Sequence, residues 1–509
     1  MKGQAESLFT QITDNTCDNC LSRNLTPSVA DSARTAYAME RRDHWDKTAQ
    51  RREASSMSSC YQDRLLSTYR FLINPGLRVL EVGCGRGNLL AGLDPAEGVG
   101  IDFAPAMIAM ARQRHPRLTF IQMDIHDLDV HDLPQELARP FDAIILSDLV
   151  NDLWDTREVL ESIKPLFKRD TRLFLNFHSY LWERPFALAQ RFNLVTPRLV
   201  QNWFTPDDMR NMLDLAGFEA VWTFDTFLWP WKVPVLEPLC NRFLSKIAPF
   251  RWLSITHFMV CRFKFPPMEH RSVSVVVPAR NEAGNIEAAV QRIPEMGAGT
   301  EIIFVEGNST DNTWDVIKDV VARYSNRRCK ALRQPGKGKG DAVRAGFAAA
   351  EGDILMILDA DLTTPPESLP QFYHAIASGK AEFVNGVRLV YPQEKEAMRF
   401  WNLVGNKFFS LAFSWLLDRS IKDTLCGTKV LSRNHYREIA ENRSYFGQFD
   451  PFGDFDLLFG AAKLNLKIVD LPVRYRSRTY GETNISRWRD GSILLRMALF
   501  AALRIKFAK

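Results

Sequence analysis

Two acidic residues follow a nearly continuous apolar segment in the second half of the chain. Ile354–Leu358 runs directly into Asp359-Ala360-Asp361. Carboxylates at alternate positions after a strand can turn toward one divalent cation, and hard oxygen ligands favour Mg²⁺ or Mn²⁺. Such a cation would neutralise the charge on a departing diphosphate. The spacing therefore predicts Asp359 and Asp361 as metal ligands and as catalytic residues of a group transfer.

Other polar residues in this half stand where strands are expected to end. Two strands, Val273–Val277 and Glu301–Val305, each run into polar residues, and Gly336–Asp341 offers backbone amides and two ammonium groups to an anion. The latter is not a Walker A loop, because Asp341 stands where that loop requires Lys-Ser/Thr. Open α/β sheets bind ligands at the carboxyl ends of their strands. The candidate substrate-binding residues are Pro278, Glu282, Glu306, Asp311, Lys337 and Lys339.

Three arginines alternate near the C-terminus. Arg474, Arg476 and Arg478 could present three guanidinium groups to a phosphate from one face of an extended segment, and the alternative is salt bridging on a surface strand. If the acceptor of the group transfer is a phosphate, it is already ionised and needs cations to orient it. If the acceptor is a hydroxyl group, it needs a carboxylate base to remove its proton. Asp423 and Asp454 are the candidate catalytic bases, and their alternative is an orienting or metal-side role.

The first half of the chain has a different glycine signature. A strand over Arg78–Val82 runs into Gly83-Cys84-Gly85-Arg86-Gly87, where glycines let the backbone approach a ligand and helix N-terminal amides face it. Asp102 ends the next strand, about 20 residues on, where a carboxylate can accept both hydroxyls of a ribose. Asp124 ends a third strand. This order predicts a site for a nucleoside-containing cofactor.

Over roughly residues 60–263 the chain resembles class I S-adenosylmethionine-dependent methyltransferases, whose E-x-G-x-G-x-G loop matches Glu81 to Gly87. The resemblance implies that this loop holds the methionine portion, that Asp102 binds the ribose and that Asp124 meets the adenine amino group. It also implies that Ser147, at the end of a fourth strand, faces the transferred methyl. The implied cofactor-binding residues are Glu81, Gly83, Gly85, Gly87, Asp102, Asp124 and Ser147.

A hydride-transferring dehydrogenase is the structural rival of this interpretation. Its usual loop is G-x-G-x-x-G, and Asn88 stands in place of the final glycine. If the methyl acceptor carries a proton, His178, Asp148 or Asp152 could act as the base, although a lone histidine near a strand end is more often structural.

Over about residues 272–490 the chain resembles the inverting family 2 glycosyltransferases of GT-A fold, and among them the polyprenyl- or dolichyl-phosphate sugar transferases. The resemblance implies that Pro278, Glu282 and Glu306 border the nucleobase and ribose of a nucleotide sugar. It implies that Asp359 and Asp361 engage the metal and the diphosphate. Because Glu306-Gly307 replaces the more usual Asp-Asp, the donor stays open between UDP- and GDP-linked sugars.

Three shorter motifs extend this second resemblance, namely Asp423–Lys429 (D-x-x-C-G-x-K), Phe455–Leu458 (an acidic helix start) and Arg478–Thr483 (R-x-x-G-x-S/T). In this subgroup such arginines contact donor or acceptor phosphate, which implies Arg474, Arg478 and Thr483 as substrate-binding residues. A processive polysaccharide synthase is the nearest competitor, because Asn484–Trp488 has the spacing of its Q-x-x-R-W element. Those enzymes normally carry their own membrane helices.

The composition fits two large folded domains. Of 509 residues, 46% are hydrophobic and 25% are charged, which is far from the composition of disordered chains. Helix-like and strand-like segments alternate, as in α/β folds with parallel sheets. We expect two open-sheet α/β domains in series, a Rossmann-like methyltransferase followed by a GT-A glycosyltransferase. The expected divisions are a mobile leader or cap at 1–40, the methyltransferase domain at 41–265, a linker at 266–271, and the glycosyltransferase domain with a basic amphipathic tail at 272–509.

The distribution of charge favours a membrane surface as a partner. The formal charge is +5, but residues 463–509 hold 11 Lys and Arg against 3 Asp and Glu. With the short apolar segments Trp401–Leu417 and Ile493–Phe507, this fits a lipid acceptor and an anionic membrane surface, although both segments could be packing helices or a dimer contact. Neither segment is long enough to span a bilayer. Nucleic acid is not expected, because no base-reading motif accompanies the basic residues.

Cysteine usage bears on the compartment. The 8 cysteines have no regular spacing and no secretory segment precedes them, which favours reduced thiols and a cytoplasmic protein, peripheral at the cytoplasmic membrane face. Cys17 and Cys20 form one CxxC, but a tetrahedral zinc site needs further ligands and none follow nearby.

These observations predict a bifunctional enzyme. One activity is S-adenosylmethionine-dependent methyl transfer to an unknown acceptor. The other is Mg²⁺- or Mn²⁺-dependent transfer of a sugar from a nucleotide sugar to a polyprenyl-phosphate-like lipid. The alternative is a family 2 glycosyltransferase acting on a hydroxyl acceptor in glycan or glycolipid synthesis, with the first domain as an S-adenosylmethionine-binding regulatory or scaffolding module.

Overall fold

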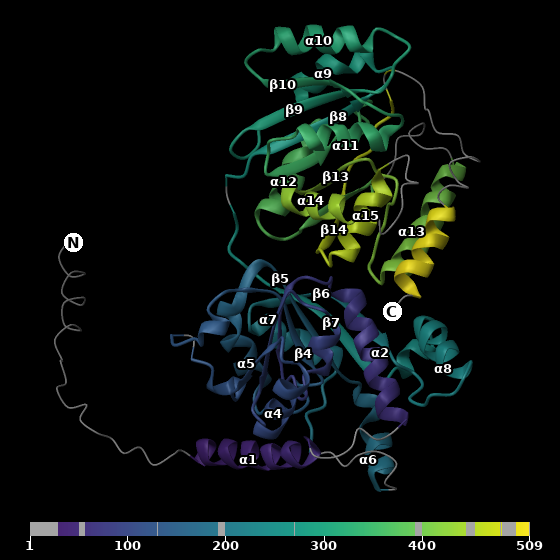
Figure 1. Ribbon diagram of the computed structural model, residues 1–509. Coiled ribbons are helices and arrows are strands. Elements are labelled where there is room, and N and C mark those ends of the chain that lie inside the picture. The colour runs from purple at the N-terminus through teal and green to yellow at the C-terminus, as the bar shows by residue number, and fades with distance from the viewer. Residues whose placement is uncertain are drawn as a thin grey trace, which may run out of the picture.

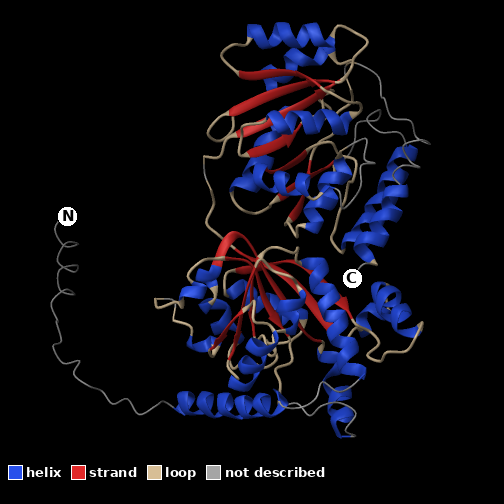
Figure 2. Cartoon of the chain, in the orientation of Figure 1, coloured by secondary structure: helices blue, strands red, loops and turns tan. Residues whose placement is uncertain are grey.

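The computed structural model describes residues 29–49, 56–129, 131–191, 199–268, 270–391, 400–443, 453–478, 480 and 495–507. Within them the chain forms two α/β units in series, each built on a seven-stranded sheet (Figure 1). Figure 2 shows that helices surround the strands of each sheet. The expectation of two α/β domains in series is confirmed.

The first sheet has the strand order β3-β2-β1-β4-β5-β7-β6, with β1 to β5 parallel and β7 antiparallel to both of its neighbours. Its strands are β1 (Arg78–Val82), β2 (Glu97–Asp102), β3 (Thr119–Gln122), β4 (Phe141–Ser147), β5 (Phe167–His178), β6 (Phe218–Thr226) and β7 (Thr256–Phe263). Its helices are α1 (Val29–Ala49), α2 (Ser56–Leu72), α3 (Asn88–Gly92), α4 (Pro105–Arg114), α5 (Thr156–Ser162), α6 (Glu183–Arg191), α7 (Pro206–Leu215) and α8 (Leu236–Pro238).

The second sheet has the order β10-β9-β8-β11-β13-β12-β14, with β13 antiparallel to β11 and β12. Its strands are β8 (Val273–Ala279), β9 (Thr300–Glu306), β10 (Arg328–Arg333), β11 (Ile354–Ile357), β12 (Phe383–Val387), β13 (Lys429–Ser432) and β14 (Ile468–Pro472). Its helices are α9 (Ile286–Arg292), α10 (Thr313–Arg323), α11 (Lys339–Ala349), α12 (Leu369–Ala377), α13 (Phe400–Leu417), α14 (Arg433–Glu441) and α15 (Asp454–Lys463), and residues 495–501 are helical and continue into a π-helix at Ala502–Lys506.

The strands expected from the apolar segments named above are present, and their observed ends differ from the expected ones by at most two residues. Pro278 does not break its strand, since β8 continues to Ala279. The neighbouring strand β11 ends at Ile357, opposite Val276. A proline is tolerated beyond the end of a neighbouring strand because no ladder hydrogen bond is lost there. The strand therefore carries Pro278 to the edge where ligands of such sheets bind.

Helix α1 crosses the boundary expected at residue 40, so its first part falls in the expected leader or cap and its second part in the expected methyltransferase domain. Polar contacts fix it to the first domain: Trp45 Nε1 donates to Asp152 at 3.1 Å, and Asp46 Oδ1 accepts the Ala106 N–H at 2.9 Å. The Arg86 guanidinium donates to the carbonyl of Ala49 at the end of the helix. The apolar contacts of α1 are few, with Ala49 and Trp45 packing near Met107, so α1 lacks the apolar periodicity that would have revealed it. Residues 1–28, with Cys17 and Cys20, lie outside the described part.

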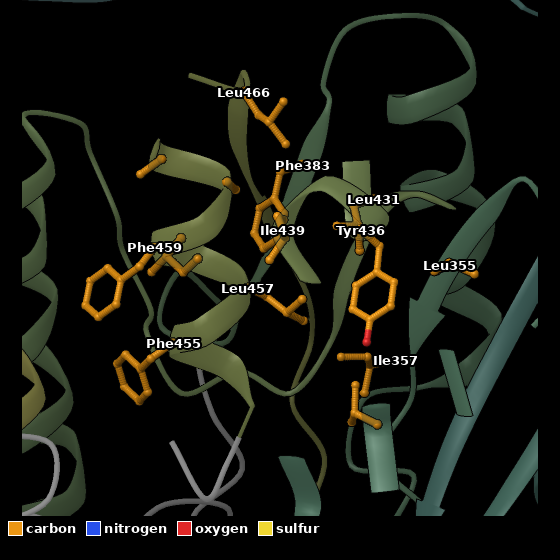
Figure 3. Packing of buried hydrophobic residues seen from close by; sticks show 14 of the residues in the cluster. Leu355, Ile357, Phe383, Leu431, Tyr436, Ile439, Phe455, Leu457, Phe459 and Leu466 are labelled. Carbon is orange, nitrogen blue, oxygen red and sulfur yellow. The ribbon is translucent and has the colours of Figure 1, made fainter. Parts of the chain in front are cut away.

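Aromatic and aliphatic side chains fill the space between the second sheet and its covering helices (Figure 3). Phe455 and Phe459 of α15 pack against Phe413 of α13, with ring centroids 5.1 Å away in both pairs. Helix α13 is therefore partly a packing helix, while its Leu411 side chain is exposed. Of the helices that the structure describes, none combines the length and apolarity needed to cross a bilayer.

A buried polar junction joins the two domains. Arg172 Nη2, on β5, lies 2.8 Å from each carboxylate oxygen of Glu382, just before β12. Arg172 Nε donates to the Asn465 carbonyl at 3.1 Å, and the Asn465 side chain donates to Leu72 O at 3.0 Å. Burial acts to raise the pKa of Glu382, but Arg172 and Arg262 overcome it and hold that pKa below its ordinary value. These contacts hold the two domains in a defined orientation.

Candidate active sites of the two domains

The acids after β11 lie against cations from other elements. Lys339, the first residue of α11, places its Nζ 2.7 Å from Asp359 Oδ1 and 3.9 Å from Asp454 Oδ2, at the start of α15. Burial acts to lower the pKa of Lys339, but Asp359 and Asp454 overcome it and raise that pKa well above its ordinary value. The ammonium group is therefore held charged beside both carboxylates.

Asp361 and Glu282 share a second cation. Arg478 Nη2 lies 2.6 Å from Asp361 Oδ2, and Arg478 Nη1 lies 3.4 Å from Glu282 Oε1. Thr363 fixes the other Asp361 oxygen through its N–H and its hydroxyl. Burial raises the pKa of Glu282. The four acids and two cations of this cluster leave a surplus of negative charge at the carboxyl ends of β8 and β11.

Two helix N-termini converge on the same cluster. A Cβ added to Gly453, which precedes α15, would lie 2.8 Å from the Cα of Gly340 in the first turn of α11. A Cβ added to Gly427 would lie 2.1 Å from Asp359 Oδ2 and 2.4 Å from Lys339 Nζ. Only glycine permits the approach of Gly453 to the Gly340 backbone, and a larger residue at position 427 would displace the Asp359 and Lys339 side chains. Helix N-termini favour anions, so the arrangement suits a phosphate group beside the acids.

Metal binding by the chain alone finds limited support. Among the described residues, no three His, Cys, Asp or Glu side chains converge as a complete metal-binding group. Asp359 and Asp361 are nevertheless oxygen donors in a cluster with surplus negative charge. Mg²⁺ is commonly held by one or two carboxylates together with substrate phosphates and water. The donor set fits a cation that a diphosphate would help to bind.

The remaining substrate-binding candidates are distributed more widely. Glu306, at the end of β9, is buried and accepts the Ser309 N–H at 2.5 Å. Asp311 accepts from the Thr313 N–H at 3.0 Å and so fixes the start of α10. Pro278 is half-buried at the end of β8, and Lys337 is exposed on its loop.

Of Arg474, Arg476 and Arg478, the described contacts bring Arg478 to Asp361 and Glu282. The Arg474 guanidinium lies 5.1 Å from the centre of the Tyr391 ring, and the Arg476 N–H donates to the Thr363 carbonyl. Thr483 lies outside the described residues, as does the Asn484–Trp488 segment.

Asp423 has no open oxygen for proton transfer. It is fully buried, and its oxygens accept from Arg388 Nε at 2.8 Å, from Arg388 Nη2 at 2.9 Å and from the Leu425 N–H at 3.0 Å. Burial acts to raise its pKa, but Arg388 holds that pKa below its ordinary value. This geometry suits a positioning residue. The partner Arg388 was missed from sequence because it follows β12, 35 residues earlier, outside any motif.

In the first domain the glycine loop lies against Asp102. Gly83, Gly85 and Gly87 have φ angles of 74°, 50° and 75°, in the left-handed region that glycine favours. The Gly85 N–H donates to Asp102 Oδ2 at 2.8 Å, and the Ala104 N–H donates to Oδ1 at 2.9 Å. Burial raises the pKa of Asp102 to about 6. Glu81 accepts the Leu90 N–H at 3.1 Å, and burial raises its pKa to about 8.

Asp124 follows β3 and lies in a polar setting. Its Oδ1 is 2.9 Å from the ring of His126 and also accepts the His126 N–H. Burial acts to raise the pKa of Asp124, but His126 overcomes it and lowers that pKa. Asp124 therefore remains ionised at neutral pH, as an acceptor for an amino group would need to be.

A polar cluster surrounds the residue after Ser147. Asp148 has φ 54°, and its carboxylate lies 2.7 Å from Tyr61 Oη and 2.6 Å from Asn176 Nδ2. His178 is buried, with its ring 5.9 Å from that of Tyr61. Tyr61 and Asn176 were missed from sequence, and the position of Asn176 near the end of β5 was the available signal.

Comparisons with known proteins assign both domains. Residues 73–217 match the family model described as a methyltransferase domain, and residues 274–439 match that of glycosyl transferase family 2. The chain therefore carries a methyltransferase domain and a family 2 glycosyltransferase domain, and both indicate transferase activity.

Relatives of the second domain include polyprenyl-phosphate sugar transferases. A dolichol-phosphate mannosyltransferase from Pyrococcus furiosus is 29% identical over 42% of this chain and 59% of its own length. A dolichyl-phosphate hexose transferase from Haloferax volcanii is 29% identical over 44% of this chain and 90% of its own length. An undecaprenyl-phosphate 4-deoxy-4-formamido-L-arabinose transferase from Aeromonas hydrophila is 32% identical over 21% of this chain and 34% of its own length.

Two solved structures each match less than half of the chain. Magnesium protoporphyrin IX methyltransferase from Synechocystis is 18% identical over 46% of this chain and 98% of its own, with a TM-score of 0.31. Glucosyl-3-phosphoglycerate synthase from Mycobacterium tuberculosis, in complex with Mn²⁺, UDP and phosphoglyceric acid, is 21% identical over 46% of this chain and 78% of its own, with a TM-score of 0.34.

Proposed function

We propose that the second domain transfers a sugar from a nucleotide sugar to a polyprenyl-phosphate-like lipid, with Mg²⁺ or Mn²⁺, and that the first domain transfers a methyl group from S-adenosylmethionine. The observation that carries the sugar transfer is the cluster in which Lys339 and Arg478 hold Asp359, Asp361 and Glu282. It supports both a metal and a phosphate at one sheet edge. The named relatives of this domain act on lipid phosphates.

Asp359 and Asp361 would hold the metal ion together with the donor diphosphate. The ion would supply charge neutralisation for the departing nucleoside diphosphate. Glu306 and Pro278 stand at the ends of β9 and β8, where they would border the nucleoside. Both strands are parallel neighbours, so their carboxyl ends lie together.

The acceptor phosphate would be oriented by cations rather than activated by a base. Its ionised oxygen would attack the anomeric carbon while the bond from that carbon to the diphosphate breaks. Arg478 would contact a phosphate, with the N-termini of α11 and α15 beside it. Asp423 would position the Arg388 guanidinium. A base at Asp454 would be required only for a hydroxyl acceptor.

In the first domain, Asp102 would accept the ribose hydroxyls of S-adenosylmethionine, and the Gly83–Gly87 backbone would hold its methionine portion. Asp124 would meet the adenine. Asp148, with Tyr61 and Asn176, would orient the methyl acceptor next to Ser147. In-line positioning is the main requirement for methyl transfer from a sulfonium.

The test of sugar transfer uses radiolabelled UDP- and GDP-sugars with a polyprenyl phosphate and Mn²⁺, and counts label in butanol-extractable lipid. Asp359→Asn combined with Asp361→Asn should lower this labelling at least about a hundredfold. The matched control is Asp315→Asn, because Asp315 is an exposed acid on α10. Labelling that survives the double substitution would refute the metal role, and label confined to a water-soluble glycan would refute the lipid acceptor.

The test of the first domain is calorimetric titration with S-adenosylmethionine, followed by methyl release on cell extract. Binding that Asp102→Ala weakens, together with turnover, supports the methyltransferase. Binding without turnover on any extract fraction would favour the regulatory alternative.

A further inference from the structure

Apolar side chains are exposed over three segments that come from both domains. The first is residues 228–254, between β6 and β7, which we call the aromatic insertion. The second is α13, and the third is the C-terminal helix, residues 495–507. Of the 26 large apolar side chains that are exposed in the described part of the chain, 9 lie in the aromatic insertion and 3 in each of the two helices. This concentration exceeds the scattered apolar exposure of ordinary protein surfaces.

The three segments lie beside one another (Figure 1). Trp415 Nε1 of α13 donates to the Lys246 carbonyl of the aromatic insertion at 3.2 Å. Arg242 Nε donates to the Phe507 carbonyl at 2.9 Å, and the Phe243 and Phe507 rings are 5.1 Å apart. The aromatic insertion therefore extends the apolar surface of the second domain onto the first.

The aromatic insertion is held together by a buried polar residue. Asn241 is fully buried, and its Oδ1 accepts the N–H groups of Leu228 and Trp229, each at 2.8 Å. Its Nδ2 donates to the Trp229 carbonyl. While this polar group is satisfied inside, Val235 is 79% and Trp252 is 66% exposed. The outward apolar side chains are thus presented by a folded element.

The exposed charges on these segments have one sign. Among the side chains described in the three segments, the exposed charged residues are Lys232, Arg242, Lys407, Arg496 and Arg504, although Lys232 pairs with the exposed Asp63 of α2 at 2.6 Å, which offsets its charge. Basic groups next to exposed aromatic and aliphatic side chains match the chemistry of an anionic bilayer, whose headgroups attract cations and whose acyl boundary accepts apolar groups. A protein partner would need an acidic and apolar surface of the same extent.

The aromatic insertion stands next to the candidate methyl-transfer site. Phe227 and Ile255, which flank it, pack in one buried cluster with Cys60 and against Tyr61. Tyr61 Oη in turn lies 2.7 Å from Asp148. The buried base of the insertion therefore packs against a residue of that site.

We propose that the aromatic insertion is a bilayer-docking element of the methyltransferase domain, and that it binds an anionic phospholipid surface together with α13 and the C-terminal helix. This goes beyond the proposed function, which brings only the sugar acceptor from the membrane. The insertion places both domains on one bilayer. Its test uses no catalytic readout, so it stands or fails separately from either activity.

The test is co-sedimentation of the full chain with vesicles of phosphatidylcholine alone and of phosphatidylcholine mixed with phosphatidylglycerol. The wild type should bind the mixed vesicles, and salt should weaken that binding. Val235→Asp combined with Trp252→Asp should lower the partition coefficient at least about tenfold, because each side chain would lose its burial in the acyl boundary. The control is Leu215→Asp on α7, where the leucine is 71% exposed outside the three segments.

Three results would overturn the proposal. One is that the Val235→Asp and Trp252→Asp variant binds vesicles as well as the wild type does, while a variant with Leu411→Asp and Leu499→Asp does not bind them. The bilayer contact would then belong to the second domain alone. Another is absence of wild-type binding to the mixed vesicles. If the wild type is then a dimer that the insertion variant converts to monomer, the occupant of the surface is a second copy. The last is equal loss of binding in the Leu215→Asp control.

Discussion

Replacing Arg172 by methionine is expected to destabilise the junction between the domains by about 3 kcal/mol. The Arg172 and Glu382 side chains are 7% and 8% exposed, and Arg172 Nη2 lies 2.8 Å from both carboxylate oxygens. Removing one partner of a buried ion pair costs about 3–5 kcal/mol, because the other charge is left desolvated. The lower end applies because Arg262 Nη1 remains 3.5 Å from Glu382 and the Lys467 N–H still donates to it.

The pH dependence of this effect has a definite sign. The pKa of Glu382 is lower in the folded chain than its ordinary 4.5. The stability that its carboxylate contributes is therefore present above about pH 4.5 and is lost as the pH falls through the lower folded pKa. The difference between the wild type and Arg172→Met should shrink over that acidic range.

Urea unfolding followed by tryptophan fluorescence measures the difference. The Trp222 ring, one of 12 tryptophans, contacts Arg419 across the junction, with 5.2 Å between guanidinium carbon and ring centre, so part of the signal comes from this region. Arg323→Met is the control, because Arg323 pairs with Glu287 on an exposed surface and its loss should leave stability unchanged. Restoring stability with Arg172→Met plus Glu382→Leu would support the desolvation argument. Equal unfolding midpoints for Arg172→Met and Arg323→Met would refute it.

Two further predictions concern the sites. Gly427→Ala should lower sugar transfer at least about tenfold without weakening S-adenosylmethionine binding, because the new Cβ would lie 2.1 Å from Asp359 Oδ2. The control is Gly405→Ala, whose new Cβ has no heavy atom within 4 Å and which should leave sugar transfer unchanged. Equal rates of sugar transfer for the two variants would contradict the close approach at Gly427. Burial raises the pKa of Asp102 to about 6, and the ionised form is the better ribose acceptor, so the calorimetric Kd for S-adenosylmethionine should be constant above pH 6 and rise about tenfold per pH unit below it. In Asp102→Asn the Kd should lose this slope, and a slope that persists would exclude Asp102 as its source.

The local pattern was sufficient to predict two open-sheet α/β domains and the sheet edge on which the candidate residues of each domain lie. Apolar runs predicted β1 at its observed bounds and β8 to within two residues, because strands in the middle of a parallel sheet are buried on both faces and are therefore mostly apolar. Acids and glycines follow these runs directly, so the sequence also placed them at the carboxyl edges of the sheets. Helix α1 was not predicted because polar contacts and a small apolar cluster fix it, and so few apolar positions give no hydrophobic period.

The side-chain partners within the sites followed from no local pattern. Asp361 meets Arg478, 117 residues later in the chain, and Asp423 meets Arg388 rather than a reacting group. A charged residue needs a partner if it is buried, but the sequence does not show which helix, strand or loop will supply that partner.

The amino-acid sequence by itself determined two α/β domains of transferase type and the loops that hold the candidate site residues, because strand burial and turn geometry depend on neighbouring residues. Tertiary packing decided the pairings between distant elements, among them the Arg172–Glu382 junction and the joining of the aromatic insertion with α13 and the C-terminal helix. These contacts arise only when separately formed elements exclude water between them. Each buried charge pairs with the opposite charge that packing brings next to it, whatever their separation along the chain.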